Sequence, residues 1–173
     1  TNHYLGEINP NRVLASYYDG ELLVVFARPT RSYAWDFGSI ELARLWGPDN
    51  HVHILSQFLS KALKTLKVDF PDIEMVVSYA DAEEGHTGGI YRASNFVYWK
   101  RNPDRVCYMI IDGVRTHCRT ANHRFGTSSV GKLRELGHVV ETERRKGKPV
   151  FLYPLTYKAR KWTRSNCEPS FLV

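Results

Sequence analysis

A long amphipathic helix followed closely by a buried strand constrains the fold of this chain more than any other feature. Over residues 53–67, apolar side chains recur every three or four positions, and lysines lie on the opposite side. This period is typical of a helix with one face against a core. Phe70-Pro71-Asp72 ends the helix, and residues 74–80 form a short apolar run typical of a buried strand. The pattern predicts a mixed α/β fold.

Shorter runs predict the other elements. Residues 13–18 and 22–27 are β-rich and are joined through Asp19-Gly20, a pair typical of a hairpin turn. Further strands are expected at residues 40–46, 96–99, 106–111, 139–142 and 150–153, and further helices at residues 88–94 and 128–136.

The chain shows no internal repeat and no linker long enough to divide it. The sequence therefore predicts one domain over residues 1–173, with a central mixed β-sheet flanked by helices and a basic C-terminal part from about residue 100. The tail after Pro154 is basic and aromatic and is expected to be irregular.

Composition excludes several classes of protein. With 43% hydrophobic and 13% aromatic residues, the chain can fill one core and is not a disordered tail. No segment approaches about 18 uninterrupted apolar residues, so no membrane span is expected. The first residues lack the pattern of a secretory signal, and the three cysteines lack CxxC spacing. We therefore expect a cytoplasmic protein with reduced thiols.

Charge is distributed unevenly along the chain. Residues 1–99 carry 8 Lys and Arg against 12 Asp and Glu, whereas residues 100–173 carry 16 against 6. A basic region joined to an acidic one indicates a polyanionic partner, and nucleic acid is the first candidate. A solubilising face is the alternative. The expected nucleic-acid-binding side chains are Arg101, Arg105, Arg115, Arg119, Arg124, Arg144, Arg145, Lys146 and Lys148.

The segment 76–98 is the densest in candidate chemistry. A buried strand ends at Tyr79 and delivers Asp81 to the carboxyl end of a sheet, where open α/β folds bind ligands. A polar turn with Gly85, Gly88 and Gly89 follows, and the next helix begins there. Glycines allow strained turns and a close approach of the backbone to a ligand.

Ile90-Tyr91-Arg92-Ala93-Ser94-Asn95-Phe96-Val97-Tyr98 resembles the signature of GNAT acyltransferases, in which a helix carrying a tyrosine ends in a turn and an aromatic strand. The resemblance implies acetyl-CoA as cofactor. It also implies that Tyr91 lies beside the thioester sulfur as a general acid. A tyrosine that only packs on the sheet is the structural alternative.

A longer string resembles the phage Mom family, whose members modify adenine N6 in phage DNA and block host restriction. It comprises Ser78-Tyr79-Ala80-Asp81, Gly85-His86-Thr87-Gly88 and Tyr91-Arg92-Ala93-Ser94-Asn95-Phe96, and the match extends over about residues 38–155. The resemblance implies double-stranded DNA as partner, with the adenine flipped out of the stack, in the cytoplasm of the host cell.

This resemblance implies roles for several side chains. Tyr91, Asp81 and Ser56 are the expected catalytic residues, and a turn-capping role is the alternative for Asp81. Ser78, Tyr79, His53 and Asn95 are the expected cofactor-binding residues. A structural polar group is the alternative for Ser56, Ser78, Tyr79 and Asn95, and a surface histidine is the alternative for His53. The usual GNAT pyrophosphate loop is absent, and residues 48–57 stand in its place; a helix N-terminus there can still hold a phosphate.

The metal content is not derivable from the sequence. The Mom-type acetamide is joined through its methyl carbon, and simple acyl transfer does not form that bond. A further activating element is required, and a metal such as iron is one candidate. His117-Cys118-Arg119 with His123 matches no common metal-site spacing, so no ligand set is assigned.

Two other functions remain open at this point. The chain could be a GNAT N-acetyltransferase with another acceptor, namely a hypermodified base, a protein or a small amine, in which case the basic half is dispensable. It could also be a non-catalytic DNA-binding module of the same fold, which would bind DNA but not acetyl-CoA. Nothing in the sequence fixes the oligomeric state.

Overall fold

The computed structural model describes residues 10–30, 33, 35–48 and 52–167, without the side chains of Val52 and His53. The chain divides into two compact units. The larger unit is formed by Thr1–Arg101 and Pro149–Val173, and the smaller unit is Asn102–Lys148. The smaller unit lies inside the expected basic C-terminal part, and the expectation of one GNAT-like domain over residues 1–173 stays a prediction.

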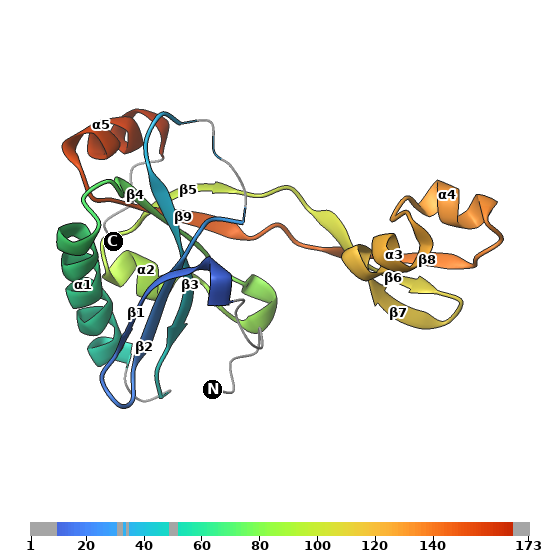
Figure 1. The fold of residues 1–173 in the computed structure, drawn as a ribbon, viewed down its shortest axis with the longest axis horizontal. Helices are drawn as coiled ribbons and strands as arrows, with labels where there is room; N and C mark the ends of the chain where they lie inside the picture. The colour runs from blue at the N-terminus through green and yellow to red at the C-terminus, as the bar shows by residue number, and fades with distance from the viewer. Residues whose placement is uncertain (1–9, 31–32, 34, 49–51, 168–173) are drawn as a thin grey trace. The chain divides into compact units, whose positions relative to one another are not determined.

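The larger unit is built on a six-stranded sheet (Figure 1). Its strands lie in the order β1 (Val13–Tyr18), β2 (Leu23–Ala27), β3 (Ser39–Trp46), β4 (Met75–Tyr79), β9 (Pro149–Pro154) and β5 (Val97–Arg101), after a short 3-10 helix, Pro10–Arg12. β3 and β4 are parallel and are connected through α1 (Val52–Asp69); the other described pairs are antiparallel. The predicted mixed sheet with flanking helices is confirmed, and so is the hairpin at Asp19-Gly20.

Helix α1 covers one face of this sheet. Leu59, Leu63 and Leu66 are buried there against Phe26 and Val76, as the helical period predicts. Burial of each such side chain stabilises the fold by about 1.5–3 kcal/mol. The short helix α2 (Gly89–Ala93) contacts α1. This face therefore holds both helices of the candidate site.

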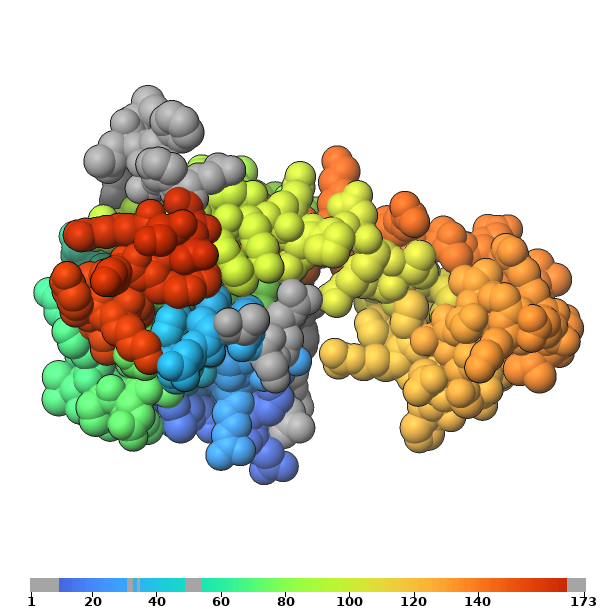
Figure 2. Space-filling view, turned by 90° about the horizontal axis from the view of Figure 1, so that it is seen from above, coloured from blue at the N-terminus to red at the C-terminus, as the bar shows by residue number. Residues whose placement is uncertain are grey.

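Helix α5 (Tyr157–Asn166) packs on the face of the six-stranded sheet opposite to α1. The expectation of an irregular tail after Pro154 is therefore wrong. Thr156 begins this helix, and its Oγ1 accepts a hydrogen bond from the Ala159 N–H (3.3 Å). The ring of Trp162 contacts Trp35 at a centroid distance of 5.1 Å. In Figure 2, the red surface of α5 lies against the light-blue surface of the segment that leads into β3.

The smaller unit has a three-stranded antiparallel sheet with two helices. Its strands lie in the order β7 (Val114–His117), β6 (Arg105–Ile111) and β8 (Val140–Arg145), and its helices are α3 (Cys118–Phe125) and α4 (Val130–Glu135). Its own core comprises Met109, Ile111, Ala121, Leu133 and Val140. β7 and α3 were not among the predicted elements.

The smaller unit is closed where the chain enters and leaves it. The Asn102 N–H donates to the Lys148 carbonyl (3.0 Å), and the Gly147 N–H donates to Asp104 Oδ1 (2.7 Å). A Cβ on Gly147 would lie 1.5 Å from the Asn102 oxygen, so only glycine fits here. This closure explains how 102–148 folds around a core of its own.

Among the described residues, none of the helices combines the length and the apolar character needed to cross a bilayer.

Candidate active site

The carboxyl end of β4 carries Asp81, as predicted. Asp81 is only 3% exposed. Its carbonyl oxygen accepts hydrogen bonds from the Glu84 N–H (3.1 Å) and the His86 N–H (3.0 Å), which shape the turn of the 3-10 helix Ala82–Glu84. Asp81 is the N-cap residue of that helix, and its carboxylate makes no capping hydrogen bond, so its part in the turn is made through its backbone. The turn explanation of Asp81 therefore holds through its backbone, and a catalytic role for its buried carboxylate stays a prediction.

Tyr91 points its phenol at the same end of β4. Its Oη lies 3.5 Å from the Tyr79 carbonyl oxygen, two residues before Asp81 along the chain. The ring packs at centroid distances of 5.5 Å from Phe96 and 5.2 Å from Phe151. The structure therefore brings the Tyr91 phenol to the end of the strand that Asp81 follows, and the meeting of the Tyr91 and Asp81 side chains stays a prediction.

Gly88 fixes the start of α2. It has φ +84°, in the left-handed region, and a Cβ there would lie 2.3 Å from the Phe151 ring. Glycine is required for both reasons. The tight packing of this turn on Phe151 sets the depth of α2, and hence of Tyr91, over the sheet.

Asn95 closes α2 through its backbone. It has φ +61°, its N–H donates to the Arg92 carbonyl (3.0 Å), and the Phe96 N–H donates to the Tyr91 carbonyl (2.9 Å). These bonds and the Phe96–Tyr91 ring contact form a Schellman motif. The observed role of Asn95 is thus to terminate the helix that carries Tyr91, and a cofactor-binding role stays a prediction.

The Tyr91 phenol is held in its protonated form. Burial raises the pKa of Tyr91, and a hydrogen-bonding contact with the Ser78 hydroxyl, outside standard geometry, lowers it in part. The Ser78 Oγ is fully buried yet has no hydrogen-bond partner of standard geometry among the described residues. A buried hydroxyl without such a partner is uncommon in proteins. This pair can offer a proton and a hydrogen-bonding group to a ligand.

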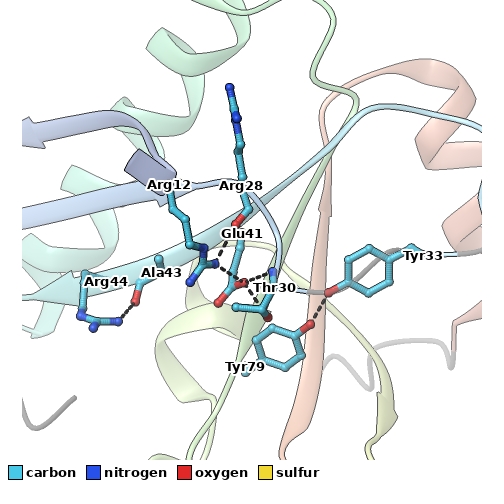
Figure 3. Close-up of polar contacts among 8 residues, drawn as sticks. All are labelled: Arg12, Arg28, Thr30, Tyr33, Glu41, Ala43, Arg44 and Tyr79. Atoms are coloured by element: carbon cyan, nitrogen blue, oxygen red, sulfur yellow. Dashed lines mark hydrogen bonds and ion pairs between the residues drawn. The ribbon is translucent and has the colours of Figure 1, made fainter. Parts of the chain in front are cut away.

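Ser78 and Tyr79 point to opposite faces of the sheet, because side chains alternate along a strand. Ser78 lies beside Tyr91, whereas Tyr79 packs with the core on the α5 face. The Tyr79 phenol is hydrogen-bonded to the Tyr33 phenol, as Figure 3 shows. The structure therefore does not bring these two expected cofactor-binding side chains together.

Ser56 and His53 both belong to α1. Ser56 is half-buried, and its carbonyl accepts a hydrogen bond from Ser60 Oγ (2.9 Å). The side chain of His53 lies outside the described residues, as do residues 49–51 of the loop expected to bind phosphate. Their expected roles stay predictions.

The sequence did not single out two other polar features. Ser94, at the end of α2, is buried and its Oγ also has no hydrogen-bond partner among the described residues. Glu41, expected only to face away from the core, accepts hydrogen bonds from the Thr30 N–H (3.0 Å) and Oγ1 (3.1 Å) and pairs with Arg12 (3.4 Å) (Figure 3). Neither has a local sequence signal, because each depends on contacts made only in the folded chain.

The expected nucleic-acid-binding residues belong to both units. Arg101 ends β5 in the larger unit, and the other eight belong to the smaller unit. The exposed ones are Arg101, Arg105, Arg115, Arg119, Arg124, Arg144 and Lys146, and the half-buried ones are Arg145 and Lys148.

Arg115 and Arg145 already contact other side chains. Arg115 donates from Nε and Nη2 to the two carboxylate oxygens of Glu143, both at 2.7 Å, and its guanidinium lies 3.9 Å from the centre of the Tyr108 ring. The Arg145 guanidinium lies 5.0 Å from that ring centre. The charge of Arg115 is therefore largely neutralised.

The next feature is the placement of the side chains that could bind a metal ion. Among the described residues, no group of three or more His, Cys, Asp or Glu side chains is placed to hold a metal ion. His117 has a structural role, because its Nδ1 accepts a hydrogen bond from the Arg119 N–H (3.0 Å) and caps α3. The activating element expected from the chemistry is not located by these residues.

Comparison with known proteins supplies the family. The model of the Mom protein family matches residues 1–170. A curated relative, the methylcarbamoylase mom of Escherichia phage Mu, is 40% identical over 60 residues, covering 34% of this chain and 25% of the relative. This chain thus spans about a quarter of the length of the curated relative that it matches. Since the family model covers nearly the whole chain, this chain belongs to the Mom protein family.

Proposed function

We propose that this chain is an enzyme that modifies adenine N6 in phage DNA, using acetyl-CoA as the acyl source, and thereby protects that DNA from host restriction. Membership of the Mom family supports DNA as the substrate. The observation that carries the chemistry is the buried Tyr91 phenol beside the buried Ser78 hydroxyl, at the end of the strand that Asp81 follows.

The residues at this end of β4 suit an acyl thioester. Such a cofactor supplies an activated acyl group and a sulfur leaving group. In acetyl transfer the C–S and N6–H bonds break and the N6–C(acyl) and S–H bonds form; an acetamide joined through its methyl carbon requires the further activating element as well. A tyrosine phenol holds its proton near neutral pH, and burial raises the pKa of Tyr91 further, so Tyr91 acts as a proton donor rather than a base. Ser78 offers a buried hydroxyl for a polar atom of the ligand.

Asp81 is the acceptor of the N6 proton. Adenine N6 is a poor nucleophile because its lone pair is delocalised into the ring, so the amine has to be oriented and its proton removed as the new bond forms. A carboxylate at the strand end can do both when the base is held within about 3–3.5 Å of the reacting groups. The base must leave the duplex stack to reach it, at a cost of about a few kcal/mol that contacts to the DNA offset.

Nucleoside mass spectrometry tests this function. Purified protein is incubated with acetyl-CoA and duplex DNA, and the DNA is digested and weighed. The wild type should produce a heavier adenosine, and Tyr91→Phe and Asp81→Asn should each slow its formation by about 10²–10⁴-fold. Tyr153→Phe is the matched control, since this tyrosine also packs on Phe96, at 5.2 Å.

Two outcomes would count against the proposal. Unmodified adenine with the wild-type protein removes the proposed substrate, and equal losses in Tyr91→Phe and Tyr153→Phe remove the role of the Tyr91 hydroxyl. An acetylated protein or small amine in place of adenine would favour the alternative acyltransferase. DNA binding without any thermal shift on adding acetyl-CoA would favour the non-catalytic module.

A further inference from the structure

We propose that α3 of the smaller unit reads base edges in the major groove of duplex DNA through Arg119, Asn122 and His123. This deepens the proposed function, on which it rests for duplex DNA as the partner. The sequence indicates only that the basic part binds nucleic acid; the structure distinguishes, within that part, a surface suited to recognise sequence.

α3 is held firmly on its inner side. Ala121 is fully buried, and Cys118 and Phe125 pack against the core of the smaller unit. His117 caps the first turn, and Gly126, with φ +70°, ends the helix. The helix can therefore present its outer side as a fixed surface.

The outer side of α3 carries a stripe of polar side chains. Arg119, Asn122 and His123 are exposed, and Asn122 and His123 follow Arg119 by three and four residues, so each of them neighbours Arg119 on the helix surface. None of these three side chains forms a hydrogen bond or an ion pair within the described part of the chain. The helix contains no Asp or Glu. Basic and amide groups are thus displayed without an acidic neighbour on the same helix.

These residue types suit the major groove. An arginine can donate two hydrogen bonds to guanine and an asparagine can pair in a bidentate manner with adenine. An α-helix is about 10–12 Å in diameter with its side chains, which matches the width of about 12 Å of that groove. The smaller unit carries ten Lys and Arg against five Asp and Glu, so its charge is complementary to the phosphate backbone.

Other surfaces of this unit are less suited. Helix α4 has only 6 residues, includes Glu135, and its Arg134 donates to the Val140 carbonyl (2.9 Å). The face of the sheet away from the helices carries Arg115, which Glu143 neutralises. Of these surfaces, α3 is therefore the one best suited to contact base edges.

The test measures sequence preference with the full-length protein and without acetyl-CoA. Short duplexes with a randomised centre are selected for binding and sequenced, and the affinity for the selected duplex is measured by fluorescence anisotropy. We expect Arg119→Ala and Asn122→Ala each to weaken binding by about tenfold and to relax the preference at one position. Arg119→Lys keeps the charge but loses the bidentate geometry, so it should also relax the preference.

Lys132→Ala is the matched control, because it removes one positive charge from an exposed position on the neighbouring helix. It should leave the selected sequence unchanged, and circular dichroism checks that every variant is folded. The proposal is overturned if the wild type selects no sequence, if the α3 variants select the wild-type sequence, or if Lys132→Ala changes the preference. This experiment measures binding and not catalysis. The proposal for α3 can therefore be overturned while adenine modification is observed, and adenine modification can be absent while α3 is found to read the DNA sequence.

Discussion

At the scale of single residues, Ser78 decides between a structural and a functional explanation of the candidate site. Its buried Oγ has no standard hydrogen-bond partner among the described residues. Removal of such a hydroxyl from a folded protein is close to neutral or stabilising, by up to about 1 kcal/mol. Its nearness to Tyr91 nevertheless lowers the pKa of that phenol in part.

We expect Ser78→Ala to retain or gain stability in urea unfolding while losing adenine modification by about tenfold or more, because the ligand loses a polar contact. Ser94→Ala removes the other buried partnerless hydroxyl and should keep the activity. A Ser78→Ala protein that is fully active would show that this serine only fills space.

Gly88 supplies a second prediction at this scale. Gly88→Ala should destabilise the fold by about 2–4 kcal/mol, because a Cβ would both collide with Phe151 and occupy left-handed backbone. Gly85→Ala meets the same backbone penalty, at φ +77°, but no atom within 4 Å. It should therefore cost only about 1–2 kcal/mol in the same urea titration. Equal costs would mean that the packing of the turn on Phe151 does not position α2.

At the scale of elements, the cap of α3 makes the smaller unit sensitive to pH. His117 Nδ1 accepts a hydrogen bond from the Arg119 N–H, which requires an unprotonated nitrogen. Burial, with Arg119, Arg105 and Arg145 nearby, lowers the pKa of His117 below its usual 6.5. The unfolded chain therefore takes up this proton first as the pH falls. The contribution of the cap is complete above the unfolded pKa and is lost as the pH falls from there through the folded pKa.

We expect the wild type to lose up to about 1 kcal/mol of stability between about pH 7.5 and about pH 5.5 from this cap. His117→Asn keeps a capping oxygen and should remove that part of the pH dependence, whereas His123→Asn, in the same helix, should retain it. The carboxyl of Asp112 does not interfere, because its hydrogen bond from His138 lowers its pKa below 3.8. If the stability of His117→Asn depends on pH as strongly as that of the wild type, His117 is not the source of this pH dependence.

Most elements could be predicted because their signals are local. The spacing of Leu59, Leu63 and Leu66 is enough for α1, and Asp19-Gly20 is enough for the first hairpin. α5 was missed because Lys and Arg dominate it, and only Ala159, Trp162 and Thr163 pack inward; the cap at Thr156 was the available signal. α3 was missed because its inner side consists of one small buried residue, Ala121, and two partly buried ones, Cys118 and Phe125, which give no long apolar period.

The candidate site could be predicted only in part. Asp81 and Tyr91 follow from the strand end and the helix motif, and the structure places both at that end of β4. Ser78 and Tyr79 point to opposite faces of the sheet because side chains alternate along a strand. The prediction that both bind the cofactor did not take this alternation into account. The Glu143 partner of Arg115 could not be foreseen, because 28 residues separate them.

At the scale of the whole molecule, the smaller unit is inserted between two paired strands. Arg101 in β5 lies opposite Pro149 in β9, so the ends of the insertion are neighbours. We expect residues 102–148 to be replaceable by an Asn-Gly turn, which favours hairpins. The shortened protein should unfold cooperatively and bind acetyl-CoA, measured as a thermal shift, but lose DNA binding. An insoluble product would show that the larger unit does not fold without the insertion.

Isotope transfer tests the central claim most directly, namely that the strand end with Tyr91 and Asp81 transfers an acyl-derived group to adenine. Duplex DNA is treated with acetyl-CoA carrying carbon-13 in its acetyl group, and the digested nucleosides are weighed. The account predicts labelled adenosine with the wild type and about 10²-fold or greater loss of label with Tyr91→Phe. Unlabelled adenosine with the wild type, or full labelling with Tyr91→Phe, would contradict it.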